Sequence, residues 1–221
     1  MLTLKPVTQR DLAKLRGYYE NCNYRLCEYS ALVKLMWRGW LHPQYAEAAG
    51  CLIVRNTVEG VSSFEYPVPG ADGDEDAALS AIEEYCMETG MPLRFSAVPK
   101  EKGGRFFTRY PYLRFSNPRI WWDYLYAADD LRDFPGRHYS GQRNHVNRFR
   151  KLYPDARFRV LGRGDTALIE QFFSDYEAVF TKESQGARGE LALAKKMLTL
   201  AGKQYFCVGG MELDGRLISL C

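Results

Sequence analysis

The stretch RHYSGQRNHVNRFRKLY, from Arg137 to Tyr153, carries five arginine or lysine side chains and two histidines. Apolar residues recur along it at helical spacing, which is typical of an amphipathic helix. These residues are Val146, Phe149 and Tyr153, with His145 and Leu152 beside them. Ser140 is the expected N-cap, and Pro154 ends the pattern. The stretch therefore predicts a basic helix over about 141–152.

The polar residues of this helix fall on two neighbouring faces: Arg143, Asn147 and Arg150 on one, and Asn144, Arg148 and Lys151 on the other. Arginine binds phosphate through a planar fork of donors, and asparagine adds neutral donors. His145 could act as a general base if a substrate hydroxyl or amine came within hydrogen-bond reach. The structural alternatives are a packed histidine and a helix that stays solvated or pairs with the acidic run 72–88.

The composition is that of an ordinary globular protein of 221 residues, 46% hydrophobic and 14% aromatic. The formal charge is only +3, so affinity for nucleic acid or anionic lipid must come from local clustering. Such clusters exist: 72–88 holds seven acidic residues and no basic one, and 137–163 holds eight basic residues and one acid. The six cysteines form no CxxC pair, which argues against a zinc knuckle and favours reduced thiols.

Outward from the basic helix, the same order of elements is predicted on both sides. The first copy is a strand at 2–7, helices after Thr8 and over 29–40, and strands over 48–56 and 62–70. The second is a strand over 156–161, helices over 166–180 and 190–202, and a hairpin over 205–221 that turns at Asp214-Gly215. The order strand, helix, helix, strand, strand therefore occurs twice.

Between the copies, a helix ending at Gly90, a buried strand over 92–98 and a short helix over 105–110 are expected. The segment 113–131, LRFSNPRIWWDYLYAADDL, is predicted to form a pair of strands. Its alternating aromatics could stack nucleic-acid bases, but core packing is the favoured interpretation. These aromatics are Trp121, Trp122, Tyr124 and Tyr126.

The second copy ends at Cys221 inside an apolar strand, which would leave an unpaired sheet edge. We expect the chain to be a fragment, and the terminal strand could pair between two copies into a homodimer. The N-terminus has no basic segment followed by an apolar run, and no window approaches eighteen apolar residues, so a cytoplasmic protein without membrane insertion is expected.

The element order and the basic helix together resemble a known family. The run Gly136-x-x-Tyr139-x-x-x-Arg143-Asn144-His145-x-Asn147-x-Phe149, preceded by Asp123-Tyr124-x-Tyr126 and Asp130-Leu131, is similar to the signature of the phosphatidylglycerol lysyltransferase C-terminal-domain family. The resemblance covers most of the chain, from Cys27-Glu28 to the last hairpin. The chain differs from the family at Gln142, where a lysine is usual.

The resemblance implies an α+β fold of two tandem GNAT-like halves, with mostly antiparallel sheets flanked by helices. It divides the chain into a first half, 1–135, a basic linker helix, 136–156, and the start of a second half, 157–221. It implies an acyl- or aminoacyl-transferase whose donor, an aminoacyl-tRNA or an acyl-CoA, binds beyond Cys221. An RNA-binding or protein-binding module without catalysis is the alternative.

The same resemblance assigns roles to residues of the helix. The expected substrate-binding residues are Tyr139, Arg143, Asn144 and Asn147, and His145 is the candidate catalytic base. No metal site is expected. The loop PVPGADGDEDAAL of the first half lies where this fold would bind the pyrophosphate of coenzyme A, but its acidic residues would repel an anion. No donor or cofactor site is therefore expected in the chain as given.

Overall fold

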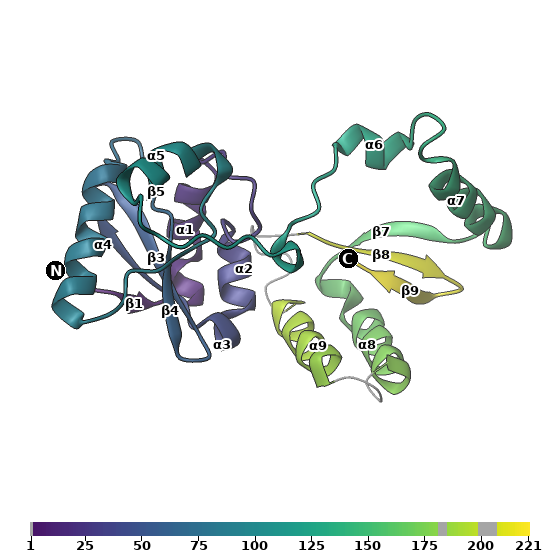
Figure 1. Cartoon of the computed structure of the whole chain (residues 1–221). Coiled ribbons are helices and arrows are strands. Elements are labelled where there is room, and N and C mark those ends of the chain that lie inside the picture. The colour runs from purple at the N-terminus through teal and green to yellow at the C-terminus, as the bar shows by residue number, and fades with distance from the viewer. Residues whose placement is uncertain (1, 181–184, 199–206) are drawn as a thin grey trace. The chain divides into compact units, whose positions relative to one another are not determined.

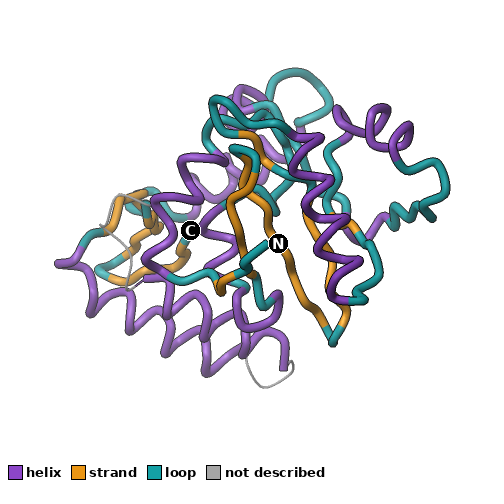
Figure 2. The backbone as a smooth tube through the Cα atoms, turned by 90° about the vertical axis from the view of Figure 1, so that its left-hand side faces the viewer, coloured by secondary structure: helices purple, strands orange, loops and turns teal. Residues whose placement is uncertain are grey.

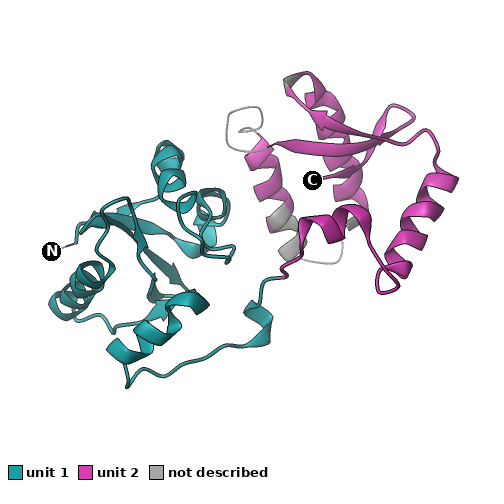
Figure 3. Ribbon diagram, turned by 90° about the horizontal axis from the view of Figure 1, so that it is seen from above, with its two compact units in different colours: residues 1–123 teal, residues 124–221 magenta. Residues whose placement is uncertain are grey.

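In the computed structural model, the chain forms two compact units, Met1–Asp123 and Tyr124–Cys221 (Figure 3). The structure describes residues 2–180, 185–198 and 207–221. Each unit holds a sheet with helices packed against it. The fold class is α+β, as predicted from the sequence.

The first unit is built on a six-stranded sheet in the order β1-β2-β3-β4-β6, with β5 also paired to β3. Neighbouring strands are antiparallel except β4 and β6, which are parallel. Its strands are β1 (Lys5–Pro6), β2 (Gln44–Ala48), β3 (Cys51–Val58), β4 (Val61–Glu65), β5 (Val68–Pro69) and β6 (Phe95–Ser96). Its helices are η1 (Gln9–Asp11), α1 (Leu12–Tyr19), α2 (Ala31–Met36), α3 (Arg38–Leu41), α4 (Glu75–Thr89), η2 (Lys100–Lys102), α5 (Gly103–Arg109) and η3 (Arg119–Trp121).

The helices of this unit cover both faces of its sheet. Helix α4 lies on one face, and α1, α2 and α3 lie on the other, so that the strands run between helices in Figure 1 and in the turned view of Figure 2. Strand β3 is buried on both faces: Cys51 and Ile53 belong to the core cluster that holds Leu79 and Ile82 of α4, and Leu52 and Val54 are buried as well. A central strand covered on both sides is therefore apolar throughout its first half.

Several local predictions for this unit are confirmed. Thr8 and Asp11 form a capping box, in which the Thr8 N–H donates to the Asp11 carboxylate at 2.8 Å. Gly90 ends α4 in the left-handed region at φ 66°. The helix expected over 29–40 is instead two short helices, α2 and α3, because the chain leaves helical geometry at Trp37 (φ −90°, ψ 12°).

Two strand predictions are wrong. Residues 48–50 were placed in a strand, but Ala49 and Gly50 form the turn between β2 and β3, and β2 itself was missed. No strand forms within 113–131; this segment contains only η3 and the helix α6 (Ala128–Asp133). Pro118 lacks the N–H that a strand ladder needs, and it starts a tight turn instead.

The aromatic residues of 113–131 are exposed rather than packed in the core. The exposed fractions are 63% for Trp121, 58% for Trp122, 89% for Tyr124 and 53% for Tyr126. Tyr124 and Tyr126 stack on each other, with ring planes 10° apart. The sequence interpretation that favoured core packing is therefore wrong for these side chains.

The second unit contains a three-stranded antiparallel sheet in the order β7-β8-β9. Besides α6, its elements are α7 (Ser140–Leu152), β7 (Arg157–Leu161), η4 (Arg163–Asp165), α8 (Thr166–Phe180), α9 (Gln185–Leu198), β8 (Val208–Leu213) and β9 (Arg216–Leu220). Helices α8 and α9 bury one sheet face around Phe173, Leu191 and Leu217. The predicted end of the second helix, 199–202, and the start of the hairpin, 205–206, lie outside the described residues.

Both units contain the same arrangement, which in the second unit follows α6 and α7. In each, a strand is followed by two or three helices and then by a hairpin whose first strand pairs with the opening strand. Both hairpins turn through two residues with positive φ, Ala49-Gly50 in the first unit and Asp214-Gly215 in the second. The equivalent of the last hairpin is thus β2 and β3.

A buried ion pair connects α2 to β4 inside the first unit. The Lys34 ammonium donates to the Glu65 carboxylate, and the two side chains are 0% and 1% exposed. The Asn56 amide of β3 donates to the same carboxylate oxygen at 2.7 Å. The second oxygen, Glu65 Oε2, has no hydrogen-bond partner among the described residues. Burial raises the pKa of Glu65, whereas Lys34 and Asn56 lower it.

We expect Lys34→Met or Glu65→Gln alone to lower the free energy of unfolding by about 3–5 kcal/mol, because each leaves one buried group without its partner. The double variant Lys34→Met/Glu65→Leu should recover most of that loss. Urea unfolding of the full chain, followed by circular dichroism, gives the free energy of unfolding of the single and double variants. Single variants as stable as the wild type would show that the pair does not hold α2 against β4.

Candidate functional site

The basic stretch forms helix α7 as predicted, with one difference at its start. The N-cap is Tyr139, not Ser140, which is the first helical residue. The chain enters the helix through a turn at Gly136 (φ 71°), and the N–H of Arg143 donates to the carbonyl of Tyr139. Among the described residues, no side-chain hydrogen bond caps the start of α7, so the Ser140 hydroxyl does not act as the expected cap. The helix ends at Leu152, just before Pro154.

Two of the predicted substrate-binding residues hold the turn that leads into α7. Arg143 donates through Nη1 to the carbonyl oxygens of Phe134 and Gly136, the latter at 2.6 Å. The Tyr139 hydroxyl donates to the Asp130 carboxylate at 3.3 Å. Carbonyl groups of a turn have no partner in a helix or a sheet and need other donors, and a guanidinium supplies several at once. Arg143 and Tyr139 thus have a structural role in this unit, and their binding role stays a prediction.

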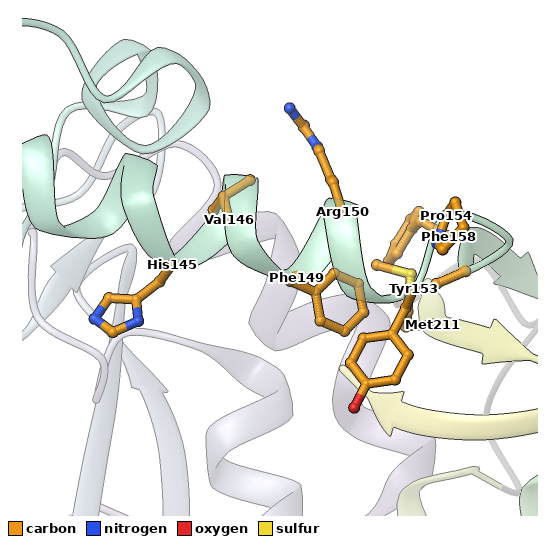
Figure 4. A pocket seen from close by; sticks show the side chains of 9 residues that line it. His145, Val146, Phe149, Arg150, Tyr153, Pro154, Phe158 and Met211 are labelled. Atoms are coloured by element: carbon orange, nitrogen blue, oxygen red, sulfur yellow. The ribbon is translucent and has the colours of Figure 1, made fainter.

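An apolar hollow lies beside α7 within the second unit (Figure 4). Its volume is about 420 Å³, within the range that holds small ligands. The lining residues are Val146, Phe149, Tyr153, Pro154, Ala156, Phe158 and Met211, together with His145 and Arg150. The α7 stripe predicted from the sequence therefore forms one wall, and β7 and β8 supply another.

Strand pairing brings the second wall together. Phe158 of β7 lies opposite Met211 of β8. The Phe158 ring lies over Gly209, where an added Cβ would come within 2.4 Å of the ring. Glycine at this position lets the aromatic ring lie against the strand. Phe158 and Met211 could not be assigned to a site from the sequence, because the register that places one opposite the other joins strands far apart in the chain.

Figure 4 shows how the side chains leave α7. The His145 imidazole and the Phe149 and Tyr153 rings project from one side, and Arg150 projects away from it. His145, Asn144 and Asn147 are exposed. His145 is the one predicted site residue that lines the hollow, while Arg143, Asn144, Asn147 and Tyr139 do not.

The cations of α7 differ from other cations of the second unit. Arg132 pairs with Asp129 and Asp133, and Arg159 pairs with Asp165 and Glu212. Among the described residues of the second unit, no carboxylate lies within ion-pair distance of the exposed α7 cations. These cations are Arg148, Arg150 and Lys151. An exposed helix face with unpaired positive charge suits an anionic ligand.

Several acidic residues of the run 72–88 pair with cations of their own unit. Asp76 pairs with Arg105, Glu83 with Arg109 at 2.9 Å, and Glu75 with Lys102 at 2.6 Å, all within the first unit. Asp74 caps α4 by accepting hydrogen bonds from the N–H groups of Asp76 and Ala77. Part of this run is therefore already paired inside the first unit, and its pairing with the basic helix stays a prediction.

One group of potential metal ligands occurs among the described residues. The ligand atoms of Cys27, Glu28 and Asp123 lie within 4.8 Å of one another. Asp123 accepts a hydrogen bond from the Cys27 N–H at 3.0 Å. Burial and a hydrogen bond to Asp123 raise the pKa of the Cys27 thiol to about 12. A metal bound there would have to displace the thiol proton, because metals bind the thiolate.

The fold and the site define an α+β protein with an apolar hollow beside a cationic helix. The family model described as phosphatidylglycerol lysyltransferase, C-terminal, matches residues 20–171. The chain therefore belongs to this family, which confirms the resemblance found in the motif around Arg143. Within the described residues, no helix combines the length and the apolar character needed to cross a membrane.

A solved structure shares the whole fold. It is the crystal structure of a conserved protein of unknown function from Bacteroides thetaiotaomicron, with a TM-score of 0.83 and 22% identity. The alignment covers 100% of this chain and 74% of that one. No curated protein matches the chain. The likeness shows the architecture and assigns no activity.

We expect Arg143→Ala to loosen the entry to α7, since the carbonyls of Phe134 and Gly136 lose a charged donor that contributes about 1.5–3 kcal/mol. Amide hydrogen exchange at the start of α7 should then become at least about tenfold faster. Arg148→Ala, an exposed arginine on the same helix, is the control. Equal exchange in both variants would rule out the structural role of Arg143.

Proposed function

We propose that this chain takes part in the transfer of an acyl or aminoacyl group to a phosphate-bearing lipid acceptor that binds in the α7 hollow. The observation that carries the proposal is an apolar, ligand-sized hollow on a helix with unpaired cations. Family membership supports it, since the family is named for lysyl transfer to phosphatidylglycerol. An acceptor with acyl chains and a phosphate matches both features.

The transfer needs few groups from the protein. A hydroxyl oxygen of the acceptor attacks the carbonyl carbon of the activated ester or thioester, and the bond from that carbon to the donor oxygen or sulfur breaks. The hydroxyl proton passes through a base to the leaving group. We assign the transfer of the proton to His145 and contact with the acceptor phosphate to Arg150, both of which line the hollow. Asn144 and Asn147 are exposed on the same helix and lie outside the hollow.

The arrangement repeated in the two units supports tandem GNAT-like halves. In that fold, N–H groups before the helix that follows the fourth strand would bind the pyrophosphate of acyl-CoA. In the first unit, the N–H groups of Gly70 and Asp74 already donate to the carbonyls of Gly50 and Ala49. The first unit therefore does not fit this donor.

The start of α4 is also occupied by the chain's own carboxylates. Asp74 caps the first N–H groups, and Glu75 accepts hydrogen bonds from Tyr66 at 2.9 Å and from Lys102 at 2.6 Å. A pyrophosphate would have to displace two carboxylates at once. We infer that the donor, an aminoacyl-tRNA or an acyl-CoA, does not bind at α4.

RNA binding is the second candidate function, and the unpaired cations of α7 favour it. Binding that depends on phosphate contacts weakens steeply as the salt concentration rises. The slope of log affinity against log salt concentration steepens by roughly one unit for each contact. In fluorescence anisotropy with tRNA, Arg148→Gln/Lys151→Gln should reduce that slope by about two. A flat salt dependence would count against RNA binding.

The lipid proposal predicts that a short-chain, monomeric phosphatidylglycerol shifts the amide NMR signals of α7 and β8 in the full chain. Phe149→Asp should weaken this binding at least about tenfold, because it places a charge in the apolar lining. Arg150→Gln should weaken it about fivefold through loss of the phosphate contact. The matched controls are Val179→Asp and Arg216→Gln, exposed positions of the same unit outside the hollow.

Both controls should bind as the wild type does. The proposal fails if phosphatidylglycerol shifts no α7 signal, or if Phe149→Asp and Val179→Asp bind equally well. Steep, salt-dependent tRNA binding without lipid binding would make RNA recognition the function of α7.

A further inference from the structure

The last part of the first unit exposes large apolar side chains over one short loop, which we name the aromatic loop (Tyr112–Trp122). In Figure 3, the chain there runs as an extended trace that ends in a short helical turn. The exposed side chains are Tyr112 at 96%, Phe115 at 70%, Ile120 at 83%, Trp121 at 63% and Trp122 at 58%. Such a concentration marks an interaction surface.

The tip of the aromatic loop is held in place by its own hydrogen bonds. The Trp121 N–H donates to the Pro118 carbonyl at 3.0 Å, which closes the turn η3. The Trp122 indole N–H donates to the Asn117 side-chain oxygen at 2.9 Å. Ile120 and Trp121 are therefore presented by a defined turn, although neither is buried.

The charges of the aromatic loop are positive. Arg114 and Arg119 are both exposed, and in the described residues neither has a carboxylate within ion-pair distance. The nearest acid along the chain, Asp123, accepts the Cys27 N–H. The loop thus combines aromatic, aliphatic and unpaired cationic side chains.

We propose that the aromatic loop docks the protein on an anionic lipid bilayer, at the level of the headgroups. Tryptophan and tyrosine favour the membrane–water interface, where an apolar ring and a polar group are both satisfied. Ile120 enters the acyl boundary, and Arg114 and Arg119 contact lipid phosphates. Docking of this kind is peripheral and needs no spanning helix.

The aliphatic residue at the tip distinguishes this partner from single-stranded nucleic acid. Nucleic-acid platforms stack bases on aromatic faces above a cationic groove. Ile120 is more exposed than Trp121 beside it and offers no face for stacking. A lipid interface accommodates Ile120 and Trp121 together.

The experiment is flotation of the full chain with vesicles of phosphatidylcholine, alone or mixed with phosphatidylglycerol. We expect binding only to the mixed vesicles, with a blue shift of tryptophan emission. Trp121→Ala should weaken binding about tenfold, through loss of its apolar surface, and Ile120→Ser by a similar factor. Arg119→Gln should weaken it about fivefold.

Matched controls are Met87→Ala, which removes an exposed apolar side chain from α4, and Arg10→Gln, which removes an exposed arginine of the same unit. Both should bind as the wild type does. The inference is overturned if the chain ignores anionic vesicles, or if Trp121→Ala and Met87→Ala bind equally. A lipid-free dimer that dissociates in Trp121→Ala, seen by light scattering, would assign the surface to a second copy.

The outcome is independent of the α7 hollow. Phe149→Asp should lose monomeric phosphatidylglycerol but still float with mixed vesicles, whereas Trp121→Ala should do the reverse. Vesicle binding lost in Arg148→Gln/Lys151→Gln but kept in Trp121→Ala would overturn docking through the aromatic loop. Circular dichroism of each variant establishes that an observed loss is not unfolding.

Discussion

The ion pair between Lys34 and Glu65 is the most deeply buried of the described ion pairs of the first unit. It joins helix α2 to strand β4, and neither charged group is exposed to water. Coulomb attraction in such a site is strong, but removing both charges from water costs a comparable amount. The pair therefore specifies where α2 lies on the sheet more than it adds stability, because any displacement of the helix would leave two charges buried and apart.

The packing around that pair follows from it. Tyr19 and Tyr29 come from the segments on either side of the loop that precedes α2, and their rings meet edge to face. The Tyr29 hydroxyl donates to the Ala97 carbonyl at 2.6 Å, next to β6. Burial and the nearby Glu65 raise the pKa of both tyrosines. Only the Tyr29 hydroxyl donates, since Tyr19 Oη has no hydrogen-bond partner among the described residues. One helix position thus fixes contacts to strands from distant parts of the sequence.

Local signals in the sequence predicted local structure well. The capping box at Thr8, the stop at Gly90 and the turn at Asp214-Gly215 each depend on a few neighbouring residues, and each is found. Strand β2 was missed because Ala46, Glu47 and Ala48 have weak strand preference, and the strand exists because β3 pairs with it. The strand prediction for 113–131 was wrong for the opposite reason. The alternating aromatic residues favour a strand, but Pro118 lacks the N–H that a strand ladder needs.

The candidate site could be predicted only in part. Periodicity placed Val146, Phe149 and Tyr153 on one face of α7, and that face does line the hollow. The opposite wall depends on strand register, because Phe158 must lie opposite Met211 and over a glycine. Arg143 was expected at a ligand because guanidinium groups bind anions, yet its described partners are backbone carbonyls, which no residue pattern reveals.

Asp74 and Glu75 make the start of α4 resistant to evolutionary change. Removing Glu75 alone would leave the Lys102 ammonium without its nearest carboxylate, and removing Asp74 alone would uncap the helix. Gly50 and Gly73 add to this resistance, since a side chain at either would come within 3.0 Å of the backbone opposite. An ancestor that bound an anion there could lose that ability in small steps, but its descendants would need several simultaneous substitutions to regain it.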